Sequence, residues 1–142
     1  QWRWALEVMS TMQSTSRVQP GVIAYSVAIS ACEKGQLWAQ ALQYLDEMLR
    51  DQLRPDVIIY NTAISACEKG LQWDIALHLM TEMRDRGLLP DAISHNAVIS
   101  ACGGGLRWEQ ALAVLRAMQL GATLPDVISY SSAISACEKG HQ

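Results

Sequence analysis

Apolar residues recur along the chain at the three- and four-residue spacings of amphipathic helices, in two alternating blocks. In the segment 57–91, the first block consists of Tyr60, Ala63, Ile64 and Cys67. The second block carries its apolar face on Trp73, Ala76, Leu77, Met80 and Met83. The pattern predicts two helices in this segment, and neither can bury its apolar face without a neighbour.

Glycine, proline and aspartate residues separate the predicted helices. Gly70 follows the first block, and we expect it to end that helix in the left-handed conformation. Gly87 ends the second helix, and Pro90 prevents its continuation. Asp91 is placed to cap the helix that follows. The order helix, glycine, helix, glycine, proline and aspartate therefore predicts a helical hairpin with a defined start and end.

This order repeats with a fixed period of 35 residues. The tetrad Ile-Ser-Ala-Cys occurs at 29–32, 64–67, 99–102 and 134–137. The columns of proline, tryptophan, alanine and methionine keep the same interval. Such a period is typical of stacked supersecondary units that contact mainly their neighbours. We therefore predict an all-α fold, a right-handed αα-superhelix of 35-residue helical hairpin repeats, with the tryptophan column in its core.

The period divides the 142 residues into a single repeat array. Complete repeats span 22–56, 57–91 and 92–126, residues 1–21 form the second half of a truncated repeat, and residues 127–142 form the first half of another. The loop between Met12 and Pro20 holds one residue more than the loop between Met48 and Pro55. Because the pattern starts and stops within a repeat, we expect the chain to be a piece of a longer array.

The cysteine pattern predicts packing rather than metal binding. The four cysteines lie one per repeat, whereas zinc sites need ligands clustered two to four residues apart. Cysteine at a repeated helical position behaves as a small buried apolar residue. We expect no metal and no cofactor.

Neither catalysis nor a membrane span is indicated by the sequence. It holds no paired carboxylates, nucleophile–base arrangement or phosphate loop outside the repeat pattern, so we expect neither an enzyme nor a small-molecule substrate. No apolar stretch is long enough to cross a membrane. The net charge of −3 counts against a nucleic-acid partner, although the local charge along a groove matters more than the sum.

The period, the Pro-Asp junction followed by VIIYNTAISACEKG, and the W-x2-A-L pattern of the second helix resemble the pentatricopeptide-repeat family. Tetratricopeptide units are about 34 residues long and start with a W-x2-L-G-x2-Y pattern, which is missing here. The resemblance implies a protein that reads single-stranded RNA one base per repeat. It places the readers near the start of each first helix, at Ser26, Asn61, Asn96 and Ser131, and at the last residue of each repeat, at Asp56, Asp91 and Asp126.

The resemblance also implies contacts that sandwich the bases and hold the phosphates. The sandwiching positions are Ile23, Ile58, Ile93 and Ile128, and the phosphate-contacting lysines are Lys34, Lys69 and Lys139. A lysine at a helix C-terminus is equally favoured by the helix dipole. In the third complete repeat, Gly103-Gly104-Gly105 replaces Glu-Lys-Gly, so that repeat lacks the lysine. We expect the glycines to weaken the helix end and to mark either a weaker binding unit or a local bend.

In the family's pairing rules, serine with aspartate resembles a guanine reader, and asparagine with aspartate a uracil reader. The complete repeats therefore predict the sequence 5′-GUU-3′. An asparagine amide offers both a donor and an acceptor, which matches the edge of uracil. The resemblance implies an RNA processing, stability or translation factor of the mitochondrion or chloroplast.

Two alternatives stay open. Each aspartate could be no more than a helix cap, with the asparagines and serines facing water. Alternatively, the superhelix could bind protein, as a structural subunit of a large organellar complex such as a ribosome or photosynthetic assembly.

Overall fold

The computed structural model describes residues 1–15, 19–121 and 123–140. These ranges contain eight helices and no strand. The helices are α1 (Trp2–Ser14), α2 (Val22–Lys34), α3 (Trp38–Arg50), α4 (Val57–Lys69), α5 (Trp73–Asp85), α6 (Ala92–Gly104), α7 (Trp108–Leu120) and α8 (Val127–Gly140). Each complete repeat thus supplies one hairpin, and the prediction of an all-α repeat superhelix is confirmed.

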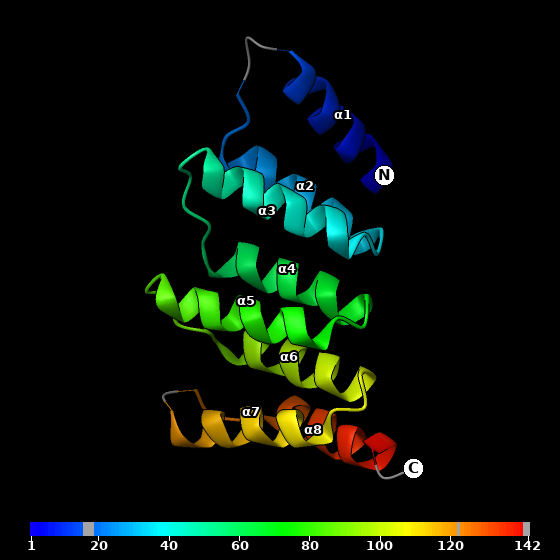
Figure 1. Cartoon of the computed structure of the whole chain (residues 1–142), viewed down its shortest axis with the longest axis vertical. Helices are drawn as coiled ribbons and strands as arrows, with labels where there is room; N and C mark the ends of the chain where they lie inside the picture. The colour runs from blue at the N-terminus through cyan, green and yellow to red at the C-terminus, as the bar shows by residue number, and fades with distance from the viewer. Residues whose placement is uncertain (16–18, 122, 141–142) are drawn as a thin grey trace.

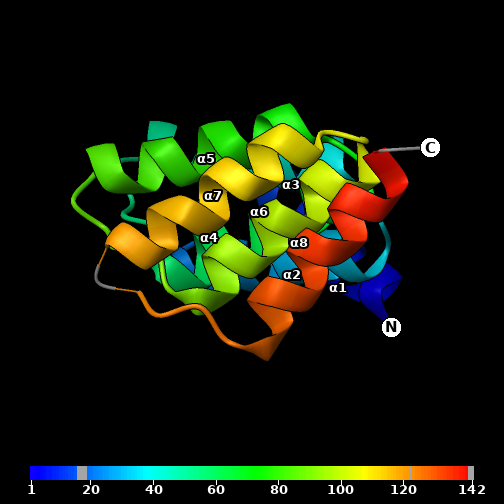
Figure 2. The ribbon, with the colours of Figure 1, turned by 90° about the horizontal axis from the view of Figure 1, so that it is seen from below.

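The hairpins stack in chain order along the long axis of the molecule (Figure 1). The first helices α2, α4, α6 and α8 pack against one another in succession, and they form one layer when viewed along the stack (Figure 2). In the described part of the chain, α3, α5 and α7 contact the first helices but not each other. Because the first helices are the more closely spaced layer, they form the inner side of the stack.

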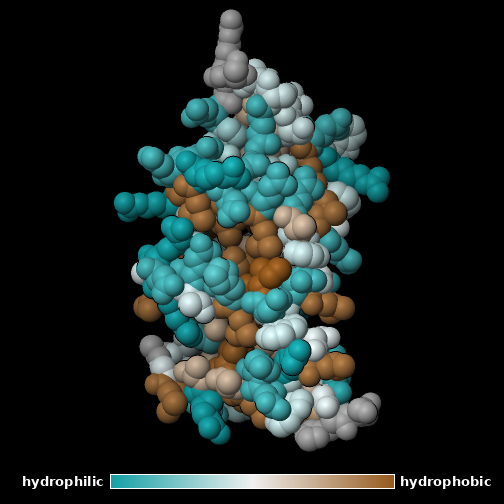
Figure 3. Space-filling view, viewed as in Figure 1, coloured by the Kyte–Doolittle hydropathy of each residue, from teal (hydrophilic) through white to brown (hydrophobic). Residues whose placement is uncertain are grey.

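The core lies between these two layers. Tyr60, Ala63, Ile64 and Cys67 of α4 are completely buried, as their spacing predicts. On α5, Met80 and Met83 are buried along with Ala76 and Leu79, while Leu77 packs against the core from its edge. Figure 3 shows the apolar surface that remains as a broken stripe between polar side chains.

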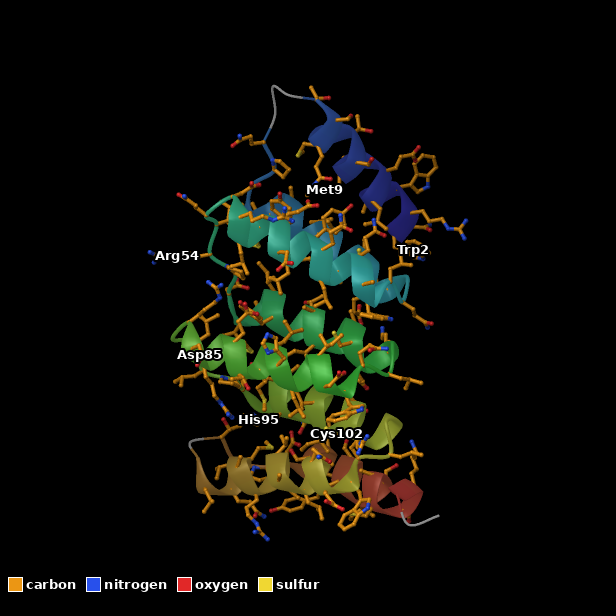
Figure 4. The ribbon with its side chains drawn as sticks, in the orientation of Figure 1. Trp2, Met9, Arg54, Asp85, His95 and Cys102 are labelled. Carbon is orange, nitrogen blue, oxygen red and sulfur yellow. The ribbon has the colours of Figure 1, made fainter. Side chains whose placement is uncertain are left out.

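Three of the four cysteines are packing residues, as expected, whereas Cys137 is only partly buried. Cys32, Cys67 and Cys102 are fully buried, and Cys102 lies within the stack in Figure 4. Burial raises the pKa of the Cys32 and Cys102 thiols to about 11 and that of Cys67 to about 12, so all three stay protonated. Among the described residues, no cluster of histidine, cysteine or acidic side chains could hold a metal ion.

The expectation that Gly70 is left-handed is wrong. Gly70 has a φ of −88°, and the left-handed residue is Leu71, with a φ of 58°. Glycine is needed at position 70 for space, because a Cβ atom there would lie 2.1 Å from Cδ1 of Trp38. Gly87, in contrast, does have a positive φ of 81° after the end of α5.

The tryptophan column lies at the margin of the core rather than inside it. Trp38, Trp73 and Trp108 are partly buried and pack against the core cluster. Each of them lies over the glycine that ends the first helix of the next repeat, namely Gly70, Gly105 and Gly140. The column therefore joins consecutive repeats, which the helical period of a single repeat does not reveal.

The triple glycine does not shorten α6. The helix runs through Gly104 and has 13 residues, the same length as α2 and α4. A Cβ atom on Gly103 would lie 3.2 Å from the Cβ atom of Ala136, so the glycine lets α8 approach α6 closely. None of the described helices is long and apolar enough to cross a membrane.

Candidate nucleic-acid interface

The aspartates at the ends of the repeats cap the first helices. The carboxylate of Asp91 accepts a hydrogen bond of 3.0 Å from the backbone N–H of Ser94. Asp56 and Asp126 make the same contact, at 2.9 Å, with the third residue of the helix that follows. The predicted cap at Asp91 is confirmed, and the caps fix each carboxylate at the junction between two repeats.

Two of the three predicted reader pairs are joined by hydrogen bonds. The Asn61 amide donates to the Asp91 carboxylate at 3.1 Å, and the Asn96 amide donates to that of Asp126 at 3.3 Å. Asn61 is only 8% exposed, whereas Asn96 is partly exposed. The fold therefore brings together residues 30 positions apart in the sequence and places them where two first helices meet.

A serine completes each of these two pairs, and sequence reasoning missed it. The Ser94 hydroxyl donates to Oδ1 of Asn61, and the Ser129 hydroxyl donates to Oδ1 of Asn96 at 2.6 Å. Both serines are fully buried, and both occupy the third position of a repeat. That shared position was the available signal, but a serine in the first turn of a helix reads as a cap.

The aspartates of these two clusters are held as carboxylates. Burial acts to raise the pKa of Asp91, but the hydrogen bonds from Ser94 and Asn61 outweigh it and bring the pKa below its ordinary value. The hydrogen bond from the backbone N–H of Ser129 is the largest cause that lowers the pKa of Asp126. The candidate interface therefore carries two fixed negative charges next to its amides.

The reader pair of the first complete repeat is arranged differently. No hydrogen bond joins Ser26 to Asp56 in the described structure, and Ile59 stands where the other repeats have Ser94 and Ser129. Ser26 lines a shallow groove between α1 and α2, together with Trp2 and Lys34. Ser131 is exposed on α8.

The four isoleucines predicted to sandwich bases lie at the surface. Ile23, Ile58, Ile93 and Ile128 are 81%, 69%, 65% and 61% exposed. They are the second residues of α2, α4, α6 and α8, and buried residues follow them one or two positions later in the same helices. Because they contribute little to the core, they leave a row of apolar side chains available for contact with a ligand.

The predicted phosphate-contacting lysines differ from one another. Lys69 forms an ion pair of 2.6 Å with Glu33 of the preceding repeat, and Ser65 donates to the same carboxylate. Lys34 and Lys139 are exposed. Gly103 stands at the position of Glu33, so Lys139 faces no glutamate equivalent to the one that Lys69 contacts.

Comparison with known families identifies the repeat. Residues 55–104 match the model of the PPR repeat family, and residues 23–53 and 93–120 match the PPR repeat model. The chain belongs to the pentatricopeptide-repeat family. No curated protein matches the sequence significantly.

Solved pentatricopeptide-repeat structures share this fold. The complex of PPR10 with an 18-nt psaJ RNA element matches 87% of this chain and 18% of that one, with 24% identity and a TM-score of 0.79. PPR10 from maize matches 94% of this chain and 19% of that one, again at 24% identity, with a TM-score of 0.77. This chain therefore spans less than a fifth of PPR10.

The PPR domain of Arabidopsis thaliana protein-only RNase P 1, in complex with tRNA, is also similar. It matches 99% of this chain and 77% of that one at 13% identity, with a TM-score of 0.83. At these identities the similarity is one of fold.

Proposed function

We propose that this chain binds single-stranded RNA along the layer formed by α2, α4, α6 and α8. Each complete repeat contacts one base, through its residue near the start of the first helix and its last residue. The observation that carries the proposal is the pairing of Asn61 with Asp91 and of Asn96 with Asp126 at the junctions between repeats. The spacing of these residues in the sequence does not require them to be in contact, whereas a site in which both residues read one base does.

The chemistry of the proposed interface suits an unpaired base. The isoleucine row presents apolar surface to the flat faces of bases, and the amides present donors and acceptors to their edges. Lys34 and Lys139 are exposed on first helices and would contact the backbone phosphates, whereas Lys69 is ion-paired with Glu33. Two solved structures with this fold contain RNA, namely PPR10 with an 18-nt psaJ RNA element and the PPR domain of RNase P 1 with tRNA, which supports RNA in general as the ligand.

The finer part of the proposal is the sequence 5′-GUU-3′, read by the repeats 22–56, 57–91 and 92–126 in that order. A protein with this preference would act in RNA processing, stability or translation in a mitochondrion or chloroplast. Three bases give little selectivity, so the biological target would be set by a longer array.

The test is a fluorescence titration of the chain against short single-stranded RNAs that contain GUU or the isomer UUG within an adenine background. We expect tighter binding to GUU and a loss of that preference in Asn61→Ala. The matched control is Thr62→Ala, because Thr62 neighbours Asn61 but uses its hydroxyl within α4, on the Ile58 carbonyl. Equal binding of both RNAs by the wild-type chain would overturn base reading, and no binding at all would overturn the RNA ligand.

A protein partner is the second candidate function. The observation that favours it is the ion pair of Lys69 with Glu33, which occupies a cation that phosphate binding needs. The same titration separates the two candidates, because a protein-binding array gives no salt-dependent affinity for RNA.

A further inference from the structure

We propose that Ser94 and Ser129 are positioning residues that set the orientation of the Asn61 and Asn96 amides and so contribute to the choice of base. The proposal rests on the proposed function, since it concerns the same reading site. It adds a third residue to each reader, located in the repeat that follows the one being read.

The hydrogen-bonding capacity of the amide is divided between protein and ligand. An asparagine side chain has two N–H donors and an acceptor oxygen with two lone pairs. Asp91 takes one donor of Asn61, and Ser94 takes one lone pair of Oδ1. One donor and one acceptor site remain, which is the combination that the N3–H and carbonyl of uracil require.

Asp91 alone does not fix the plane of the amide. A single hydrogen bond to the nitrogen leaves the side chain free to rotate about that contact and leaves Oδ1 without a partner. Because Asn61 is only 8% exposed, an unpaired oxygen there would be costly. The second contact, from Ser94, anchors the opposite end of the amide, so the remaining donor and acceptor point in one direction.

Ser94 is itself held in place. Its oxygen accepts the backbone N–H of Asp91 at 3.1 Å and lies 3.0 Å from the Asp91 carboxylate. Ser129 has the same arrangement around Asp126, at 3.1 and 2.9 Å. Each serine is thus part of a helix cap. Folding of the junction between two repeats therefore also fixes the orientation of the asparagine amide.

The chain contains an internal contrast. The two repeats with asparagine readers are each followed by a serine at the third position of the next repeat, whereas the repeat with Ser26 is followed by Ile59. Ser26 has no amide that needs to be oriented, and in the described structure no hydrogen bond joins it to Asp56. Reader and positioning residue thus change together across the three junctions.

The experiment measures binding of the wild-type chain, Ser94→Ala and Ser129→Ala to RNAs in which the second or third base of GUU is replaced in turn by cytosine. In Ser94→Ala, we expect the ratio of affinities for uracil over cytosine at the second base to fall about fivefold, which is the effect of one hydrogen bond. The same ratio at the third base should stay unchanged. Ser129→Ala should show the reverse. Ser94→Ala also loses the contact with the backbone N–H of Asp91, and Ser129→Ala the one with Asp126, so a purely structural role would lower the affinity for RNA at that junction without changing the preference for uracil over cytosine.

The outcomes separate this inference from the proposed function. A wild-type chain without any uracil preference would overturn base reading and, with it, the role of the serines in base choice. A wild-type preference that survives in both variants, or that falls equally at both positions, would overturn the positioning role alone.

A measurement without RNA tests the positioning role of Ser94 independently. The side-chain amide protons of Asn61 should exchange faster with water and shift in the NMR spectrum of Ser94→Ala, while those of Asn96 stay unchanged. Unchanged Asn61 amide signals in a folded Ser94→Ala chain would overturn the proposal.

Discussion

Trp38 packs so closely on Gly70 that a Cβ atom at that glycine would lie 2.1 Å from Cδ1 of the indole ring. The same contact recurs between Trp73 and Gly105, at 2.3 Å, and between Trp108 and Gly140, at 2.2 Å. Each tryptophan opens the second helix of one repeat and meets the end of the first helix of the next. The glycine–tryptophan contact therefore sets how closely consecutive hairpins approach.

We predict that Gly70→Ala lowers the free energy of unfolding by about 1–3 kcal/mol, because the methyl group displaces Trp38 from a packed junction. Gly21→Ala is the matched control, since it also lies next to a first helix but has no atom within 4 Å of the added Cβ position. Urea unfolding followed by tryptophan fluorescence measures both. Equal midpoints for the two variants would contradict the role assigned to the contact.

The helical pattern predicted the first helices and the burial of Cys32, Cys67 and Cys102, because these follow from periodicity within one repeat. It misassigned Gly70, where a side chain would clash with Trp38 of the preceding repeat. It also placed the tryptophans in the core, although they lie at its margin. Both errors concern contacts between repeats, which a spacing rule for a single helix does not contain.

The candidate site shows the same limit. The family resemblance supplied Asn61 and Asp91, and the structure brings them into contact. Ser94 was missed because its first-turn position reads as a helix cap, and its second contact is with a residue 33 positions earlier. Only the stacking of α4 on α6 places that hydroxyl next to the amide.

A second prediction concerns the capping aspartates. The Asp91 carboxylate accepts from the Ser94 backbone N–H and from the Asn61 amide, whereas Asp56 accepts from the Ile59 backbone alone. We expect Asp91→Ala to cost more stability than Asp56→Ala, with the cap itself worth about 1 kcal/mol in each case. Thermal unfolding of the two variants tests this. A larger loss in Asp56→Ala would show that the cluster at Asp91 adds nothing to the cap.

A third prediction is a loss of stability in mild acid caused by His95. The ring is 4% exposed and occupies the position of Tyr25 and Tyr60 in the other repeats, at the junction labelled in Figure 4. Burial lowers the pKa of His95, and Arg84 near Nε2 acts in the same direction, while the Asp91 carbonyl at Nδ1 and the charge of the Asp91 carboxylate oppose them. The neutral ring is therefore the form that the fold stabilises.

Because the folded pKa lies below the unfolded value of about 6.5, this contribution is complete above that value. It is lost as the pH falls from there through the folded pKa. We expect the unfolding midpoint to drop between about pH 7 and 5 in the wild-type chain and to drop less in His95→Tyr. His78→Gln, at an exposed site, should follow the wild-type profile. Identical profiles for His95→Tyr and the wild-type chain would assign the acid sensitivity to other groups.

The last prediction separates Lys69 as an inter-repeat contact from Lys69 as a phosphate ligand. Its ammonium group is ion-paired with Glu33 at 2.6 Å, although the lysine side chain is 41% exposed. Glu33→Gln removes the negative charge and leaves the lysine, so RNA affinity should rise about two- to fivefold at low salt. The plot of log affinity against log salt should steepen by about one unit, as one more phosphate is neutralised.

Glu7→Gln, an exposed site on α1, is the control for the change in net charge. An increase that is equal in both variants would mean that overall charge, and not the release of Lys69, governs binding. A decrease in Glu33→Gln would mean that the ion pair holds the lysine where RNA needs it. Exposed ion pairs contribute little to stability. The unfolding midpoint of Glu33→Gln should therefore stay close to that of the wild-type chain. Any change in RNA affinity then arises at the interface itself.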